Sequence, residues 1–198
     1  MTRQEMKESA KQQLKGKWGI AIGALLVANL LMTGFTTSIP LIESNLGVSL
    51  SFNLLGLIFS SVMVIGVCNF CLKVAKNENI EFTDIFSGFK VFLKAMGLNI
   101  LISLGVVLGT LLFIIPGIIL AFMWSQANYI LAEDNEKGVF QCLTESKNMM
   151  NGYKMDLFVL ELSFIGWFVL CTFTLGIGYL WLMPYYNVTL ANFYLDIK

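Results

Sequence analysis

The residue with the clearest capacity for chemistry is a single carboxylate inside a long apolar stretch. Glu161 is the only charged residue between Leu157 and Leu195. A carboxylate in hydrocarbon costs about 2.5 kcal/mol or more, so such a residue normally faces a cavity, pairs with a cation or reaches the membrane surface. Because Glu161 lies near one end of the stretch, snorkelling toward water or pairing with a nearby Lys is the simpler interpretation. A ligand site is the alternative.

A second group of polar side chains is spread over two apolar stretches. Gln126 and Asn128 lie in one of them, and Tyr185 and Asn187 lie in the other. Amides in lipid need partners, and helices exchange such hydrogen bonds to fix their packing. A polar site between the two stretches is the functional alternative, and Pro184 would kink a helix beside it. The candidate intramembrane site therefore consists of Glu161, Gln126, Asn128, Tyr185 and Asn187, with Ser125, Thr189 and Asn192 as further polar residues of the same stretches.

The remaining motifs argue against an enzyme or a metal site. The chain has no His, which removes His-based zinc sites, His-based triads and the usual neutral-pH proton carrier. Cys68 and Cys71 have redox or metal spacing, but no second ligand pair accompanies them, and cysteine is also a common small apolar residue. No nucleophile elbow, phosphate-binding loop or dinucleotide fingerprint occurs. We expect no catalysis, no cofactor, no metal and no nucleic-acid partner.

The distribution of charge indicates which elements hold these residues. All 13 Lys and Arg residues fall in four short stretches, and the apolar blocks 18–72, 95–132 and 157–195 between them contain none. Hydrophobic residues make up 57% of the chain and charged residues 13%, against roughly half and a quarter in an ordinary globular domain. A water-exposed surface cannot be built from this composition. The chain is therefore expected to be an integral membrane protein.

Block lengths predict six spanning helices in three hairpins, and hence an all-α, polytopic fold with a single membrane domain. One helix over residues 95–132 would be nearly 57 Å long at about 1.5 Å per residue. The hydrocarbon core is only about 30 Å thick, so this block must cross twice. Pro116 and Gly117 supply the turn, because proline cannot continue a helix and glycine accepts the angles of a reversal. The predicted spans are 18–37, 52–72, 95–115, 117–132, 157–173 and 177–195.

The fourth and first of these elements differ from a regular hairpin. The fourth span, at residues 117–132, is short enough to be re-entrant instead. The first hairpin has a looser polar connection, near residues 38–45.

By the positive-inside rule, every basic stretch is cytoplasmic, including the loops 73–94 and 133–156, so both termini face the cytoplasm. No cleavable signal peptide and no disulfide are expected.

The amino-terminal residues 1–17 predict a short amphipathic helix on the cytoplasmic side. Thr2 and Glu5 form a capping-box pair at its start. Its apolar side carries Met6, Ala10 and Leu14, and its cations Arg3, Lys7, Lys11 and Lys15 follow at steps of four. These cations are candidate contacts for anionic lipid headgroups. The equal alternative is a solvent-exposed segment before the first span, whose charges only set the topology. A second cytoplasmic helix is predicted over residues 136–151.

Several short runs carry a resemblance to a known family. They are Leu14–Gly19, Leu112–Ile119, Tyr129–Glu133, Glu145–Lys147, Met149–Gly152, Leu162–Trp167, Leu175–Gly178, Trp181–Leu182, Pro184–Tyr185 and Ala191–Tyr194. Together they resemble the bacterial multi-pass membrane family called domain of unknown function 975. The turn and the helix after it are also distantly similar to the membrane domain of some glycerophosphodiester phosphodiesterases, whose catalytic domain is absent here. The resemblance implies an integral membrane protein of Gram-positive-type bacteria and no particular reaction.

These observations lead to one expectation and one alternative for function. We expect a non-enzymatic accessory or partner-binding membrane component, in contact with membrane lipids and with an unidentified cytoplasmic or membrane protein. The alternative is a small transporter-like or lipid-handling protein that uses the polar residues of spans four to six. A transporter normally shows more intramembrane acids and paired broken helices than this sequence contains.

Overall fold

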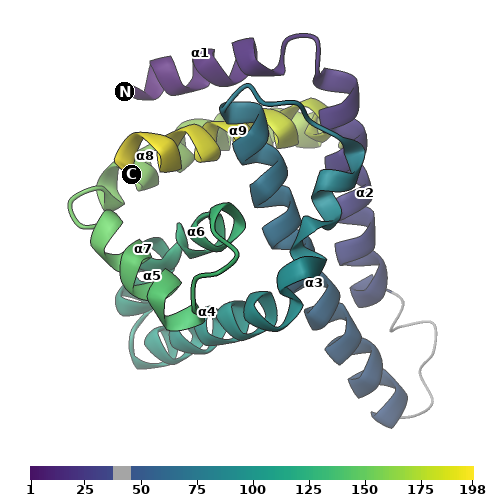
Figure 1. Cartoon of the computed structure of the whole chain (residues 1–198), viewed down its shortest axis with the longest axis vertical. Helices are drawn as coiled ribbons and strands as arrows, with labels where there is room; N and C mark the ends of the chain where they lie inside the picture. Colours follow the sequence, from purple (N-terminus) through teal and green to yellow (C-terminus); the bar gives the residue numbers. More distant parts are fainter. Residues whose placement is uncertain (38–45) are drawn as a thin grey trace.

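The computed structural model describes residues 1–37 and 46–198, with side chains at 1–34 and 55–198. Every regular element in these ranges is a helix, as the all-α prediction requires (Figure 1). In chain order they are α1 (Arg3–Leu14), α2 (Trp18–Thr37), α3 (Leu46–Ala75), the 3₁₀ helix η2 (Phe82–Val91), α4 (Phe92–Leu112), α5 (Ile114–Trp124), α6 (Ala127–Glu133), α7 (Val139–Met149), α8 (Lys154–Phe173) and α9 (Tyr179–Ile197). The predicted polar connection at residues 38–45 lies outside the described residues.

Several of these helices are long and apolar enough to cross a membrane. Four segments meet this description: Leu55–Ala75, Phe82–Leu112, Ile114–Glu133 and Lys154–Phe173. A fifth candidate combines α1 with Trp18–Gly34 of α2 across a bend of 101°. α9 is not among the candidates, because Pro184 and its asparagine and tyrosine side chains lower its apolarity. The described residues thus contain four or five candidate spans, and the predicted count of six is not confirmed.

The amino-terminal helix begins where the sequence predicts, and for the predicted reason. The Thr2 hydroxyl accepts a hydrogen bond from the Glu5 amide, and the Glu5 carboxylate accepts one from the Thr2 amide, which is a complete capping box. Gly16 adopts a left-handed φ of 82° directly after α1, a conformation that glycine accepts without strain. The chain then turns sharply into α2.

The predicted cytoplasmic loop 73–94 contains η2, which returns along α3 in the opposite direction. Lys73 pairs with Asp84 at 2.6 Å, and Asn69 donates a hydrogen bond to Ser87 at 2.8 Å. Two glycines permit this packing: a Cβ on Gly66 would lie 1.7 Å from the Ile85 carbonyl oxygen, and one on Gly88 would lie 2.0 Å from that of Val62. The backbones of η2 and α3 are thus in direct contact.

The reversal between α4 and α5 lies at Phe113 and not at Pro116 and Gly117. Phe113 is extended, with φ −159° and ψ 148°, and α5 begins at the next residue. Pro116 therefore lies in the first turn of α5, where a missing amide hydrogen costs nothing. Gly117 serves close packing, because a Cβ there would lie 2.1 Å from the Thr110 hydroxyl and 2.9 Å from the Thr110 Cα.

The predicted fourth span is interrupted at Ser125 and Gln126, between α5 and α6. An interruption frees backbone carbonyls that water cannot reach in a membrane. The fully buried Ser146 of α7 donates a hydrogen bond to one of them, the Met123 carbonyl, at 2.9 Å. The helix break is therefore stabilised by a neighbouring element.

Burial places α3 at the centre of the molecule. In an apolar 18-residue window of the Leu55–Ala75 segment 56% of the residues are buried, against 17% in the window of Phe82–Leu112 and 22% in that of Lys154–Phe173. The two poorly buried segments expose long rows of apolar side chains, which is the pattern expected of helices that face lipid. Figure 1 shows α1 and α9 side by side, with both chain termini on the same side.

Replacing Gly117 by Ala tests the close packing of the α4–α5 hairpin. The new methyl group meets the Thr110 backbone, which cannot rotate away, so we expect a loss of about 1–3 kcal/mol, typical of overpacking. Gly166→Ala in α8 is the matched control: nothing lies within 4 Å of a Cβ there. That variant should unfold at the same temperature or higher. Thermal unfolding in detergent measures both, and equal melting temperatures would contradict the packing.

Candidate functional site

The residues of the predicted intramembrane site are divided over three places. Glu161 projects from α8 into a cavity of about 270 Å³ lined by Phe122, Phe158 and Tyr186 among others. Its carboxylate interacts with the Tyr186 hydroxyl of α9. No lysine pairs with Glu161 in the described part of the chain, so Tyr186 takes the place of the predicted Lys partner.

Gln126 and Asn128 lie at the break between α5 and α6. Gln126 is only 2% exposed, and its amide nitrogen donates to the Ser125 hydroxyl at 2.9 Å. Within the described residues, the buried oxygens Gln126 Oε1 and Asn128 Oδ1 have no hydrogen-bond partner. An unpaired buried acceptor is costly, so these two oxygens stand out among the polar atoms of the described residues.

Tyr185 and Asn187 follow Pro184 in α9 but lie in different surroundings. The Asn187 side chain donates to the Met183 carbonyl at 2.9 Å. The Asn187 backbone carbonyl accepts from the Tyr129 hydroxyl at 3.5 Å. Tyr129 is the neighbour of Asn128, so this contact brings the α6 and α9 parts of the predicted site together. Tyr185 lines another cavity, beside Lys11. The structure thus separates Tyr185 and Glu161 from the amides.

Many polar side chains of the long helices bond to their own backbone. Each donates to the carbonyl oxygen four residues earlier, which satisfies the side chain without a second helix. These pairs are Asn29 with Leu25, Asn99 with Ala95, Thr110 with Val106, Asn187 with Met183 and Thr189 with Tyr185. Such groups are already occupied and are poorly placed to bind a ligand.

A partly buried amide pair that the sequence does not predict attaches α1 to the rest of the molecule. Asn192 of α9 donates to Gln13 at 2.8 Å, and Gln13 donates back to Asn192 at 3.1 Å. The Gln13 amide also donates to the Ala75 carbonyl at the end of α3, at 2.8 Å. Three helices therefore meet at one fully reciprocated pair of amides.

A second unpredicted centre is the carboxylate of Glu133 at the end of α6. It accepts from Lys76 at 2.7 Å, from Lys198 at 2.7 Å and from the Tyr194 hydroxyl at 2.6 Å. The Tyr194 ring stacks on Tyr129 with centroids 5.5 Å apart. Lys76 directly follows α3, and Tyr194 and Lys198 lie at the carboxyl-terminal end of the chain, so Glu133 joins α6 to two segments that lie far from it in sequence.

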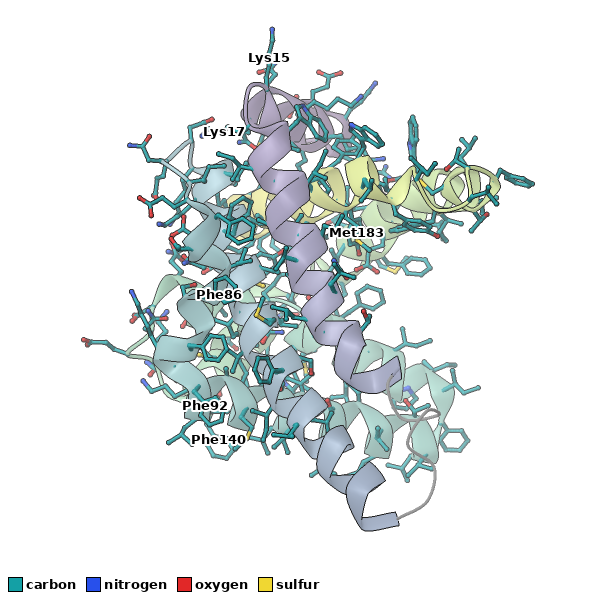
Figure 2. The ribbon with its side chains drawn as sticks, turned by 90° about the vertical axis from the view of Figure 1, so that its right-hand side faces the viewer. Lys15, Lys17, Phe86, Phe92, Phe140 and Met183 are labelled. Atoms are coloured by element: carbon teal, nitrogen blue, oxygen red, sulfur yellow. The ribbon has the colours of Figure 1, made fainter. Side chains whose placement is uncertain are left out.

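The four candidate lipid contacts of α1 have different surroundings. Lys7 lies 4.2 Å above the Phe164 ring and donates to the Ser163 carbonyl at 3.3 Å. Lys11 lies 5.4 Å from the Tyr185 ring centroid, a cation–π arrangement. Arg3 is exposed at the amino-terminal end of α1, where Met1 pairs with Asp196. Lys15 is exposed and points away from the molecule (Figure 2).

Comparison with protein families identifies one match. The family described as "Protein of unknown function (DUF975)" matches residues 1–121 and again residues 110–198, which together span the whole chain. No curated protein and no solved structure matches the chain. The distant similarity to the membrane domain of glycerophosphodiester phosphodiesterases stays a prediction.

Replacing Gln13 by Leu tests the amide pair. The change leaves Asn192, which is 5% exposed, without its partner, so we expect a loss of about 1–3 kcal/mol of folding stability. Limited proteolysis after Lys15 or Lys17 should become faster, because α1 then detaches more often. Gln12→Leu, at an exposed position of the same helix, is the control and should change neither quantity. Unchanged proteolysis of Gln13→Leu would contradict this role for the pair.

Proposed function

The chain belongs to the DUF975 family, and we propose that it is a non-enzymatic accessory component of a bacterial plasma membrane that binds a protein partner. In this proposal both termini and the loops 73–94 and 133–156 lie in the cytoplasm. Catalysis is left out because the sequence has no His and no nucleophile motif.

The observation that carries the proposal is the set of bonds between the four basic stretches. Glu133 joins Lys76 to Lys198, and Lys17 donates to the Glu78 carbonyl at 3.0 Å. These contacts connect the amino-terminal helix, both predicted cytoplasmic loops and the carboxyl terminus. Segments in mutual contact are expected on one side of a membrane, as the positive-inside rule requires of basic stretches. They also form a connected platform suited to a partner.

The second predicted cytoplasmic helix, α7, offers an anchor for such a partner. Cys142, Leu143 and Ser146 are buried on one of its sides, whereas Phe140 is 74% exposed on the other. Aromatic residues are enriched where protein partners bind most strongly. Phe140 stands among polar neighbours such as Gln141 and Thr144, which are exposed as well. We therefore assign Phe140 to the contact with the partner.

The use of polar side chains favours this function over transport. Asn29, Asn99 and Asn187 are bonded to their own helices, and a transported solute would have to break those bonds. The specific observation in favour of a transporter-like or lipid-handling protein is the pair of unpaired oxygens on Gln126 and Asn128 at a broken helix. That function is the second candidate.

A photo-crosslinking residue in place of Phe140 tests the partner. In cells, it should yield a discrete crosslinked protein in stoichiometric amount, and Phe140→Glu should abolish co-purification of that protein. The control is the same crosslinker in place of Leu111, which is 77% exposed at the tip of the α4–α5 hairpin and should capture lipid.

Equal capture from both positions would contradict an accessory function carried by α7. Loss of a solute or lipid flux in Asn128→Leu, with normal expression and melting temperature, would favour the second candidate instead.

Cysteine labelling in intact cells tests the topology. All four native cysteines are buried, so a membrane-impermeant thiol reagent should leave the parent chain unlabelled. Phe113→Cys, at a position 75% exposed at the reversal between α4 and α5, should be labelled directly. Lys15→Cys should be labelled only after the cells are permeabilised. Labelling of Lys15→Cys in intact cells would reverse the proposed orientation.

A further inference from the structure

A cavity of about 440 Å³ lies where α1, the start of α2 and the α8–α9 hairpin meet. Its volume falls within the roughly 300–1,000 Å³ typical of ligand sites. Three of the four tryptophans of the chain line it: Trp18, Trp167 and Trp181. Figure 2 shows α8 and α9 extending together to one side beneath α1. No residue of this cavity belongs to the Glu133 centre or to the amides at the helix break.

The charge beside this cavity is positive. Lys11 is the charged residue of its lining, and within the described chain it has no carboxylate partner. Arg3 and Lys7 stand on the same helix, and burial together with the charges of Lys11 and Arg3 lowers the pKa of Lys7. Glu8 is the acid whose charge reaches Tyr185 on the cavity wall. An anionic group beside Lys11 would relieve the repulsion between the cations.

The bend between α1 and α2 indicates at which level of the membrane the cavity lies. The two helices are inclined by 101°, so α1 lies along the membrane surface when α2 crosses the membrane. The corner between them then lies at the level of the lipid headgroups. Tryptophan prefers this level, because its ring is apolar and its N–H seeks a polar partner. The three tryptophans and Lys11 thus meet where a lipid presents both acyl chain and phosphate.

From this combination we propose that the cavity binds one anionic phospholipid, with an acyl chain against the tryptophans and the phosphate beside Lys11 Nζ. Charge distinguishes this occupant from bulk lipid, since an apolar groove without a cation would accept any acyl chain. The inference goes beyond partner binding and does not depend on Phe140 or on a protein partner.

Quenching of tryptophan fluorescence measures this binding. The purified full-length chain in neutral detergent is titrated with phosphatidylglycerol that carries brominated acyl chains, and separately with phosphatidylcholine that carries the same chains. Phosphatidylglycerol should quench the fluorescence saturably and at lower concentration. Lys11→Gln should weaken its apparent affinity about fivefold, the value of one lysine near an anionic lipid. Added salt should weaken it as well.

Matched variants separate the cavity from the general charge of α1. Lys15→Gln removes the same charge from an exposed position and should leave the affinity unchanged, and Lys11→Arg should retain it. Leu170→Phe narrows the cavity and should reduce quenching, whereas Val169→Phe, exposed on α8 outside the lining, should not. Melting temperatures of the lipid-free variants verify that each is folded.

Three results would each overturn the proposal. The first is equal quenching by the two lipids, which indicates unselective contact with bulk lipid. The second is an equal loss in Lys11→Gln and Lys15→Gln, which indicates general surface attraction. The third is undiminished quenching in a folded Leu170→Phe variant, which places the lipid elsewhere. None of these results bears on the crosslinking at Phe140.

Discussion

Hydrocarbon offers no hydrogen bonds, and this absence of water is the constraint on which the structure depends. The long helices satisfy their backbones internally, and Asn29, Asn99 and Thr110 return their side chains to their own helices. Where the helix breaks between α5 and α6, the Ser146 hydroxyl reaches the Met123 carbonyl from another element. At this break a second segment thus supplies the hydrogen bond, and the contact holds α7 beside the break. Among the residues that the structure describes, the buried oxygens of Gln126 and Asn128 have no hydrogen-bond partner, which makes the break the second candidate site.

Features governed by neighbouring residues could be predicted from the sequence, and features governed by distant contacts could not. The capping box at Thr2 and the helical character of the apolar blocks follow from residues a few positions apart. The path of η2 depends on Gly66 and Gly88, whose missing side chains admit a backbone from another segment. Nothing near either glycine in the sequence reveals that partner. The same applies to Gly117, whose proximity to Pro116 suggested a turn, although Thr110 is the residue that requires the glycine.

The candidate site illustrates the same division. The sequence pattern placed Glu161 and Tyr185 in one site. Adjacent residues of a helix point about 100° apart, and Tyr186 is the residue that contacts Glu161. Tyr185 consequently lines the cavity beside Lys11. The Gln13–Asn192 pair joins residues near opposite ends of the chain, and each looks like an ordinary polar residue in its local context. Only the folded arrangement shows that these amides satisfy one another.

The attachment of α1 changes the meaning of its charges. A cationic helix held by its lysines alone would contact any anionic surface in many orientations, and salt would screen that attraction. Here uncharged groups attach the helix as well: Met6, Ala10 and Leu14 are buried, and Gln13 pairs with Asn192. Its position therefore does not depend on its cations alone. Lys7 and Lys11 stand at fixed positions above the aromatic rings of α8 and α9, where an apolar wall and a positive charge meet. Fixed positions allow selection by shape as well as by charge, which a freely moving basic segment cannot achieve.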